Sequence, residues 1–288
     1  MGEAPPVLTH SRILYFVCGP APVVASGLVA VFETVSRVAD KVQWVQRHVA
    51  EELGGALDQT LDRACAAIAS AIDANAELFD QQPYHNRQHY CEVALTVYAL
   101  CLLKEVDARE TQLLLLAAFI HDFGHDGGPH GPFEQERVSI ERVRSVLEAN
   151  GVDSAQIRRL TVLVLATDPS RGTAFTAAAC RAHDGRSGDL PSVPDEAPEL
   201  ADLLDDPALA RLTRTLCEAD VLPSVGLTLE HSLQLQARLA LEWARPLGLH
   251  DKLQFIDAVL AQGFISEFFL PNVQATRAAV ARAANVHT

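Results

Sequence analysis

The chain has 288 residues, of which 49% are hydrophobic and 21% are charged, so it is globular rather than disordered and long enough for one large domain. Its formal net charge of −14 argues against nucleic acid or an anionic membrane as a partner, because both bind basic surfaces. Ala, Leu, Val, Arg and Glu recur with a 3.6-residue period, and we therefore expect an all-α protein.

The first apolar stretch, residues 13–32 (ILYFVCGPAPVVASGLVAVF), carries no charge and is long enough to cross a bilayer. Its CGPAP run would break a helix near the middle, and no basic cluster typical of a signal peptide precedes it. We therefore expect a buried segment of a soluble protein rather than a membrane span.

The six cysteines show no CxxC spacing and no regular interval. Such cysteines are typical of small core residues in a reducing compartment. We expect a cytoplasmic protein whose function does not depend on sulfur.

A heptad seam of valines follows, in which steps of four and three residues alternate between residues 31 and 49. After the GG pair at 54–55, a helical stripe resumes and runs from Leu57 to Ile72. Residues 1–80 are therefore predicted to form an N-terminal segment of long helices, distinct from residues 81–288. The seam either packs on the chain's own core or forms the contact of a homodimer, and the pattern leaves both open.

Beyond this segment the pattern predicts eight further helices and one long loop. The helices are expected at about 83–104, 109–122, 133–149, 154–167, 200–221, 227–246, 250–269 and 271–284. Residues 168–199 are rich in Pro, Gly, Ser and Asp and are expected to form a surface loop.

Histidines and aspartates gather at the ends of the expected helices. His85 and His89 are four residues apart and share a helix face, His121 and Asp122 close the next helix, and Asp220 lies near the end of a later one. Imidazole nitrogens and carboxylate oxygens together suit a divalent ion such as Zn²⁺, Mn²⁺ or Mg²⁺. The pattern predicts one or two bound metal ions, although each piece alone is also common on helix surfaces.

The same residues carry a resemblance to a known family. PYHNRQHYCEV, AAFIHDFGHDGG, LATD, EADVLPS and GFISEFFLP follow one another in the order seen in the HD superfamily of metal phosphohydrolases. The chain most closely resembles the catalytic domain of class I cyclic nucleotide phosphodiesterases, over about residues 80–280. The resemblance implies an HD-type helical bundle, here with additional N-terminal helices. It also implies metal-dependent hydrolysis of a small-molecule phosphodiester, above all a 3′,5′-cyclic nucleotide.

The resemblance further implies a role for each matching residue. It makes metal ligands of His89, His121, Asp122 and Asp220. His85 would protonate the leaving oxygen, His125 would lie beside the attacking hydroxide, and Glu134 would support them from a distance. Thr167 and Asp168 match a TD pair that is more structural than catalytic.

The sequence also departs from the family pattern. Asp126 stands in place of a proline and His130 in place of an asparagine. Phe264 matches a phenylalanine that stacks on the purine, and we expect it to bind substrate together with Gln262. However, Ala261 occupies the position of the glutamine that binds the purine edge, and Gln262 is rotated from it by about 100° on a helix.

We therefore expect weak or unselective hydrolysis of cyclic AMP and cyclic GMP, or another flat ligand in the pocket. Two alternatives remain open: a catalytically weak or inactive binding protein, and a di-iron HD-type oxygenase.

Overall fold

The computed structural model describes residues 11–128, 130–185 and 190–286, and within these ranges the chain is helical and contains no strand. The first half holds η1 (Tyr15–Cys18), α1 (Ala21–Ser36), α2 (Lys41–Leu53), η2 (Gly54–Ala56), α3 (Gln59–Ala74), α4 (Ala76–Phe79), α5 (Arg87–Leu103), α6 (Ala108–Ile120) and α7 (Glu134–Ala149). The second half holds α8 (Ser154–Leu165), α9 (Gly172–His183), η3 (Pro198–Ala201), α10 (Asp202–Asp205), α11 (Pro207–Val225), α12 (Leu229–Glu242), α13 (Leu249–Gln262) and α14 (Leu270–Val286).

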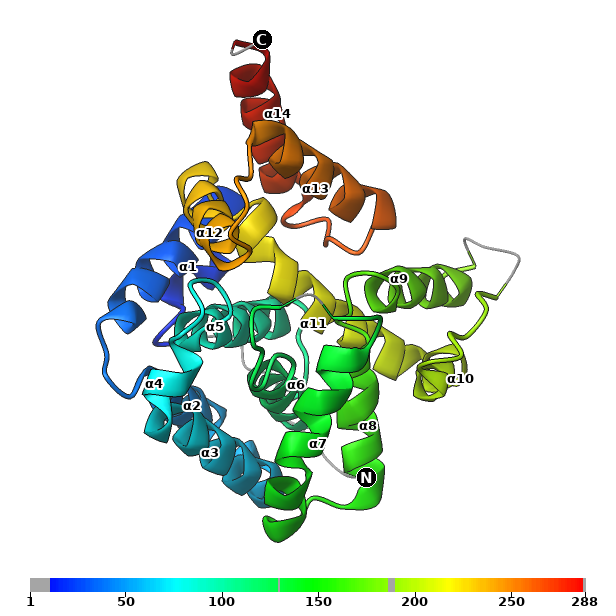
Figure 1. Ribbon diagram of the computed structural model, residues 1–288. Helices are drawn as coiled ribbons and strands as arrows, with labels where there is room; N and C mark the ends of the chain where they lie inside the picture. Colours follow the sequence, from blue (N-terminus) through cyan, green and yellow to red (C-terminus); the bar gives the residue numbers. More distant parts are fainter. Residues whose placement is uncertain (1–10, 129, 186–189, 287–288) are drawn as a thin grey trace.

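Helices α5 and α6 lie at the centre of the molecule, and α11 crosses them (Figure 1). The helices α1, α2 and α3 cover one side, α7 and α8 cover another, and α12 to α14 lie at one end. One continuous hydrophobic core reaches from Leu14 to Val280. The helices before residue 80 therefore share the core of the rest of the chain.

The two central helices are apolar on all sides, which is typical of helices buried by their neighbours. In α5 every residue from Arg87 to Cys101 is buried, and in α6 the buried run ends at Ile120. Side-chain caps fix where these helices begin, because the Asn86 side chain accepts hydrogen bonds from two amides at the start of α5 and the Asp107 side chain accepts one at the start of α6. The start of α5 lies close to the end of α6, where His89 meets His121.

The valine seam packs inside the protein. A break at residues 37–40 divides it between α1 and α2, and its members Val35, Val42, Val45 and Val49 have no exposed surface. Of the two alternatives, the structure therefore shows packing on the chain's own core.

The apolar stretch 13–32 is likewise divided, between η1 and α1. Among the described residues no helix has both the length and the hydropathy to cross a membrane. Five of the six cysteines are buried as expected, but the expectation is wrong for Cys18, which is exposed.

The expectation of an unbroken loop over 168–199 is wrong, because α9 lies within it. Asp168 Oδ1 accepts hydrogen bonds from Ser170 Oγ, Arg171 N and Gly172 N at the start of this helix. Phe175 and Cys180 are buried where α9 packs on α11. Pro169 and Ser170, which suggested a loop, form the turn before the helix, and Gly172 is its first residue.

Gly172 provides a test of this packing. A Cβ at Gly172 would lie 2.5 Å from the Leu165 carbonyl oxygen and 2.9 Å from that of Ala166, and both are backbone atoms that cannot move easily. Gly172→Ala should therefore lower the free energy of unfolding by about 2 kcal/mol, the usual cost of overpacking. Gly55→Ala is the control, because a Cβ there meets nothing within 4 Å. Equal midpoints of urea unfolding for the two variants would contradict the packing of α9.

Candidate metal centre and the cavity above it

Two histidines and two aspartates converge where α5, α6 and α11 meet. The Nε2 atoms of His89 and His121 are 3.2 Å apart, and both rings are buried. Asp122 Oδ2 lies 3.2 Å from His89 Nε2 and 3.0 Å from His121 Nε2. Asp220 Oδ1 lies 3.4 Å and 3.6 Å from the same two nitrogens. We call these four residues the metal cluster.

The metal cluster fits a divalent cation. His121 Nδ1 donates to the Ala118 carbonyl at 2.8 Å, so a neutral His121 presents the lone pair of Nε2 to the cluster. Ligand atoms of His89, His121 and Asp220 all lie within 4.8 Å of one another. Burial lowers the pKa of His89, but Asp122 and Asp220 outweigh it and raise that pKa to about 9. The two carboxylates thus create a negative potential beside the imidazole nitrogens, which favours a bound cation such as Zn²⁺ or Mn²⁺.

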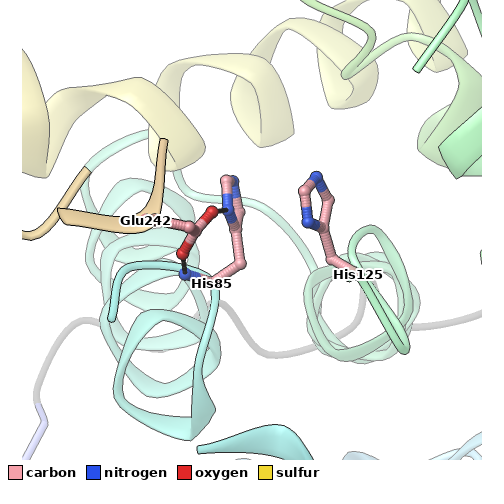
Figure 2. A group of neighbouring side chains, drawn as sticks. All are labelled: His85, His125 and Glu242. Carbon is pink, nitrogen blue, oxygen red and sulfur yellow. Dashed lines mark hydrogen bonds and ion pairs between the residues drawn. The ribbon is translucent and has the colours of Figure 1, made fainter. Parts of the chain in front are cut away.

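A second group lies beside the cluster and contains His85, His125 and Glu242 (Figure 2). Glu242, at the end of α12, accepts a hydrogen bond from His85 Nδ1. Its other oxygen accepts from the backbone amides of Tyr84 and His85, at 2.9 Å and 3.0 Å. His85 Nε2 is left facing the cluster, 3.9 Å from Asp122 Oδ2. Burial raises the pKa of Glu242, but its hydrogen bonds with His85 outweigh this and lower it, so Glu242 stays ionised.

His125 stacks on His85, with ring centroids 3.9 Å apart and ring planes 16° apart. Its Nδ1 accepts a hydrogen bond from the Gly127 amide at 2.8 Å. Burial and the neighbouring His85 lower the pKa of His125 to about 4. His125 is therefore neutral near pH 7.

A cavity of about 790 Å³ opens above these groups. Glu134 is exposed at the start of α7 and accepts from the Gly131 amide at 2.8 Å, outside the cavity wall. Glu136, two residues further along the helix, is buried and lines the cavity. Burial raises the pKa of Glu136 to about 8. The glutamate of α7 that lies at the cavity is therefore Glu136, two residues after Glu134.

The predicted substrate-binding residues do not line the cavity. Phe264 is 1% exposed and belongs to the core, and α13 ends at Gln262, just before a left-handed Gly263. Arg214 holds the carbonyls of Gly263 and Phe264, and Glu218 accepts from the Ser266 amide at 2.7 Å. These bonds to α11 fix the segment away from the metal cluster, so the expected role of Phe264 and Gln262 is not supported.

Asp126 and His130, two departures from the family pattern, lie in the loop at the edge of the cavity. Asp126 Oδ1 bonds His130 Nε2 at 2.9 Å and accepts from the Gly128 amide, in an exposed turn. Asp168 has the structural role that was expected, since its Oδ2 accepts from Phe133 N at the start of α7 while Oδ1 holds the start of α9.

Comparisons with known proteins address the fold. No protein-family model matches the chain, and no curated protein matches it in sequence. The phosphodiesterase domain of the RhoPDE fusion protein from the choanoflagellate Salpingoeca rosetta has a TM-score of 0.58 and 19% identity, over 91% of this chain and 92% of that chain. A second structure of the Salpingoeca rosetta rhodopsin phosphodiesterase domain gives 0.57 and 19%, over 91% and 89%. LmjPDEB1 in complex with IBMX gives 0.57 and 17%, over 88% of each chain.

The matched share of the chain is larger than residues 81–288 could supply alone, so the likeness extends into the first eighty residues. The all-helical architecture of this chain is thus the one that it shares with these domains. The chain therefore has the fold of the phosphodiesterase catalytic domains.

Proposed function

We propose that this chain is a metal-dependent hydrolase of phosphodiesters. The observation that carries the proposal is the convergence of two imidazole nitrogens and two carboxylates below a cavity that His85 and Glu242 also line. A divalent cation held by His89, His121, Asp122 and Asp220 would neutralise an anionic phosphodiester and lower the pKa of a water molecule. The likeness to phosphodiesterase domains supports the same class of reaction.

The charge of the cavity supports a requirement for the cation. The described part of its wall includes Arg245 and five acidic residues, of which Glu136 is mostly protonated near pH 7 and the other four are Asp122, Asp168, Asp220 and Glu242. An anionic substrate would be repelled by this wall at close range. A bound cation reverses the sign of the charge where the phosphate would lie.

His85 is positioned to act as the general acid. Glu242 fixes the Nδ1 side of the ring, and Nε2 points toward the cavity near Asp122. The Glu242 carboxylate stabilises the imidazolium, which can give its Nε2 proton to the leaving alkoxide. After the transfer, a neutral His85 keeps its Nδ1 hydrogen bond with Glu242. The neighbouring His125 is already neutral and does not compete for the proton.

We propose a 3′,5′-cyclic nucleotide as the substrate. A cavity of about 790 Å³ is within the usual range for sites that hold small molecules. The ester bond would lie above the metal cluster, and the rest of the nucleotide would extend along the cavity.

The proposal is tested by hydrolysis assays on the purified protein with Mn²⁺ or Mg²⁺. We expect cyclic nucleotides to yield nucleoside monophosphates, detected by ³¹P NMR, and bis(p-nitrophenyl) phosphate to release nitrophenol. A chelator should abolish both reactions and added Mn²⁺ should restore them. Metal binding without any hydrolysis would instead support the binding protein, and oxygen consumption by an iron-loaded protein would support the oxygenase.

A further inference from the structure

The cavity above the metal cluster extends toward α12 and α13, where Glu242 is the one cavity-lining residue that the proposed chemistry uses. A second hollow of about 400 Å³ lies there. The two hollows share six wall residues: Tyr84, Ser224, Leu239, Trp243, Arg245 and Phe255. The shared residues place the second hollow directly beside the cavity above the metal cluster.

Two of the three aromatic residues in the shared wall are exposed. Trp243 is 47% exposed and directly follows Glu242, and Phe255 is 40% exposed on α13. Large aromatic side chains are usually buried, and a flat ring stacked on them would remove this apolar surface from water. The aromatic surface of the cavity is thus made by these residues and not by Phe264.

A buried lysine lies in the wall of the second hollow. Lys252 is 4% exposed, and its Nζ donates to the carbonyls of Ser224 and Ser232 and lies 5.8 Å from the centre of the Phe255 ring. Among the described residues, no carboxylate lies within ion-pairing distance of Lys252. An ammonium group has three donors, so one remains beyond the two carbonyls. Burial lowers the pKa of Lys252 to about 8, which still leaves it mostly charged at neutral pH.

Resting on the proposed hydrolysis, we infer that Trp243, Phe255 and Lys252 recognise the base of the substrate. The two rings stack on a flat heterocycle, and Lys252 donates a hydrogen bond to an acceptor on its edge. Lysine has donors and no acceptor, so it favours guanine, whose O6 and N7 are both acceptors, over adenine, whose N7 acceptor lies beside a donor amino group. The substrate class is a cyclic nucleotide whose base carries a carbonyl oxygen, such as guanine or hypoxanthine.

Tryptophan fluorescence can test this binding directly, because the chain has two tryptophans. Trp44→Phe leaves Trp243 as the reporter, whereas Trp243→Phe leaves Trp44, which stacks on His48 of α2. Both are made in a His85→Ala background, so that the nucleotide is not consumed during the titration, and Mn²⁺ is present. Cyclic GMP and cyclic IMP should quench Trp243 and leave Trp44 unchanged.

The ligands themselves supply the comparison of base edges. Cyclic IMP has the O6 and N7 of guanine without its amino group, and we expect it to bind at least about tenfold more tightly than cyclic AMP, the usual worth of a hydrogen bond to a charged donor. Lys252→Met should remove this preference. Because Lys252 also donates to two backbone carbonyls, the thermal unfolding of the Lys252→Met protein is measured as a control. The comparison of cyclic IMP with cyclic AMP does not depend on this variant.

Equal affinity for cyclic IMP and cyclic AMP, or no quenching of Trp243, would overturn the inference. Hydrolysis of bis(p-nitrophenyl) phosphate without a Trp243 response would retain the proposed function and remove the base pocket. A selective Trp243 response in a protein whose His85 form hydrolyses no phosphodiester would retain the base pocket and remove the proposed function.

Discussion

Asp122→Ala should lose most of the bound metal and lower phosphodiester hydrolysis by roughly 10³-fold. Asp122 Oδ2 contacts both Nε2 atoms of the metal cluster, at 3.2 Å from His89 and 3.0 Å from His121. It is also the cluster oxygen within 4 Å of His85. Loss of this carboxylate removes a ligand and several kcal/mol of charge stabilisation in the transition state, which corresponds to about three orders of magnitude in rate.

Asp126→Ala is the matched control for this variant. Asp126 lies in the same loop and bonds His130 in an exposed turn outside the cavity wall. Elemental analysis should find the metal content of wild type in Asp126→Ala and little metal in Asp122→Ala. If Asp122→Ala kept its metal and its rate, the proposed ligand set would be incorrect.

His85→Ala should retain metal while its turnover falls by roughly 10²–10⁴-fold, the range for loss of a general acid. His89→Ala should instead lose metal and activity together, because His89 Nε2 lies inside the metal cluster. Glu242→Gln should lower kcat with little change in metal content, since the amide cannot stabilise the His85 imidazolium as a carboxylate does.

The control for these histidine variants is His250→Ala, which changes an exposed histidine on α13. Its metal content and kcat should equal those of wild type. Equal loss of metal in His85→Ala and His89→Ala would show that His85 is a ligand and not an acid.

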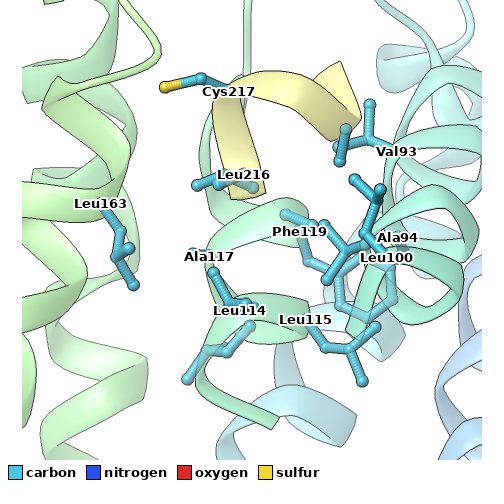
Figure 3. Packing of buried hydrophobic residues seen from close by; sticks show 14 of the residues in the cluster. Val93, Ala94, Leu100, Leu114, Leu115, Ala117, Phe119, Leu163, Leu216 and Cys217 are labelled. Atoms are coloured by element: carbon cyan, nitrogen blue, oxygen red, sulfur yellow. The ribbon is translucent and has the colours of Figure 1, made fainter. Parts of the chain in front are cut away.

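The helical class could be predicted because it depends on a local pattern, and the residues of the metal cluster could be named from motifs at helix ends and their order in a known family. The run LLLLAAFI before His121 indicates a buried helix, and a buried helix holds the residues at its end in fixed positions. Figure 3 shows this packing, in which side chains of α6 lie among those of α5, α8 and α11: Leu114, Leu115, Ala117 and Phe119 with Val93, Ala94, Leu100, Leu163, Leu216 and Cys217.

The remaining parts of the site depend on contacts between distant segments. Glu242 is 157 residues from His85 and stands in a stretch, LALEW, that carries no motif. Phe264 was assigned by its place in a family motif, but Arg214 and Glu218 of α11 hold its segment elsewhere. Glu134 is the first residue of α7, and its side chain accepts a hydrogen bond from Gly131, whereas Glu136 lines the cavity. Helical periodicity predicts which residues share a face of a helix, but it does not predict which distant segment packs against that face.

The proposed function requires that hydrolysis depend on a cation in the metal cluster. Chelator-treated protein can be titrated with Mn²⁺ while electron paramagnetic resonance measures the unbound ion and nitrophenol release measures the rate in the same sample. The account predicts a rate that rises with bound Mn²⁺, saturates at one or two equivalents, and stays near zero in Asp122→Ala. A rate that does not change with bound Mn²⁺, or no rate at saturation, would contradict it.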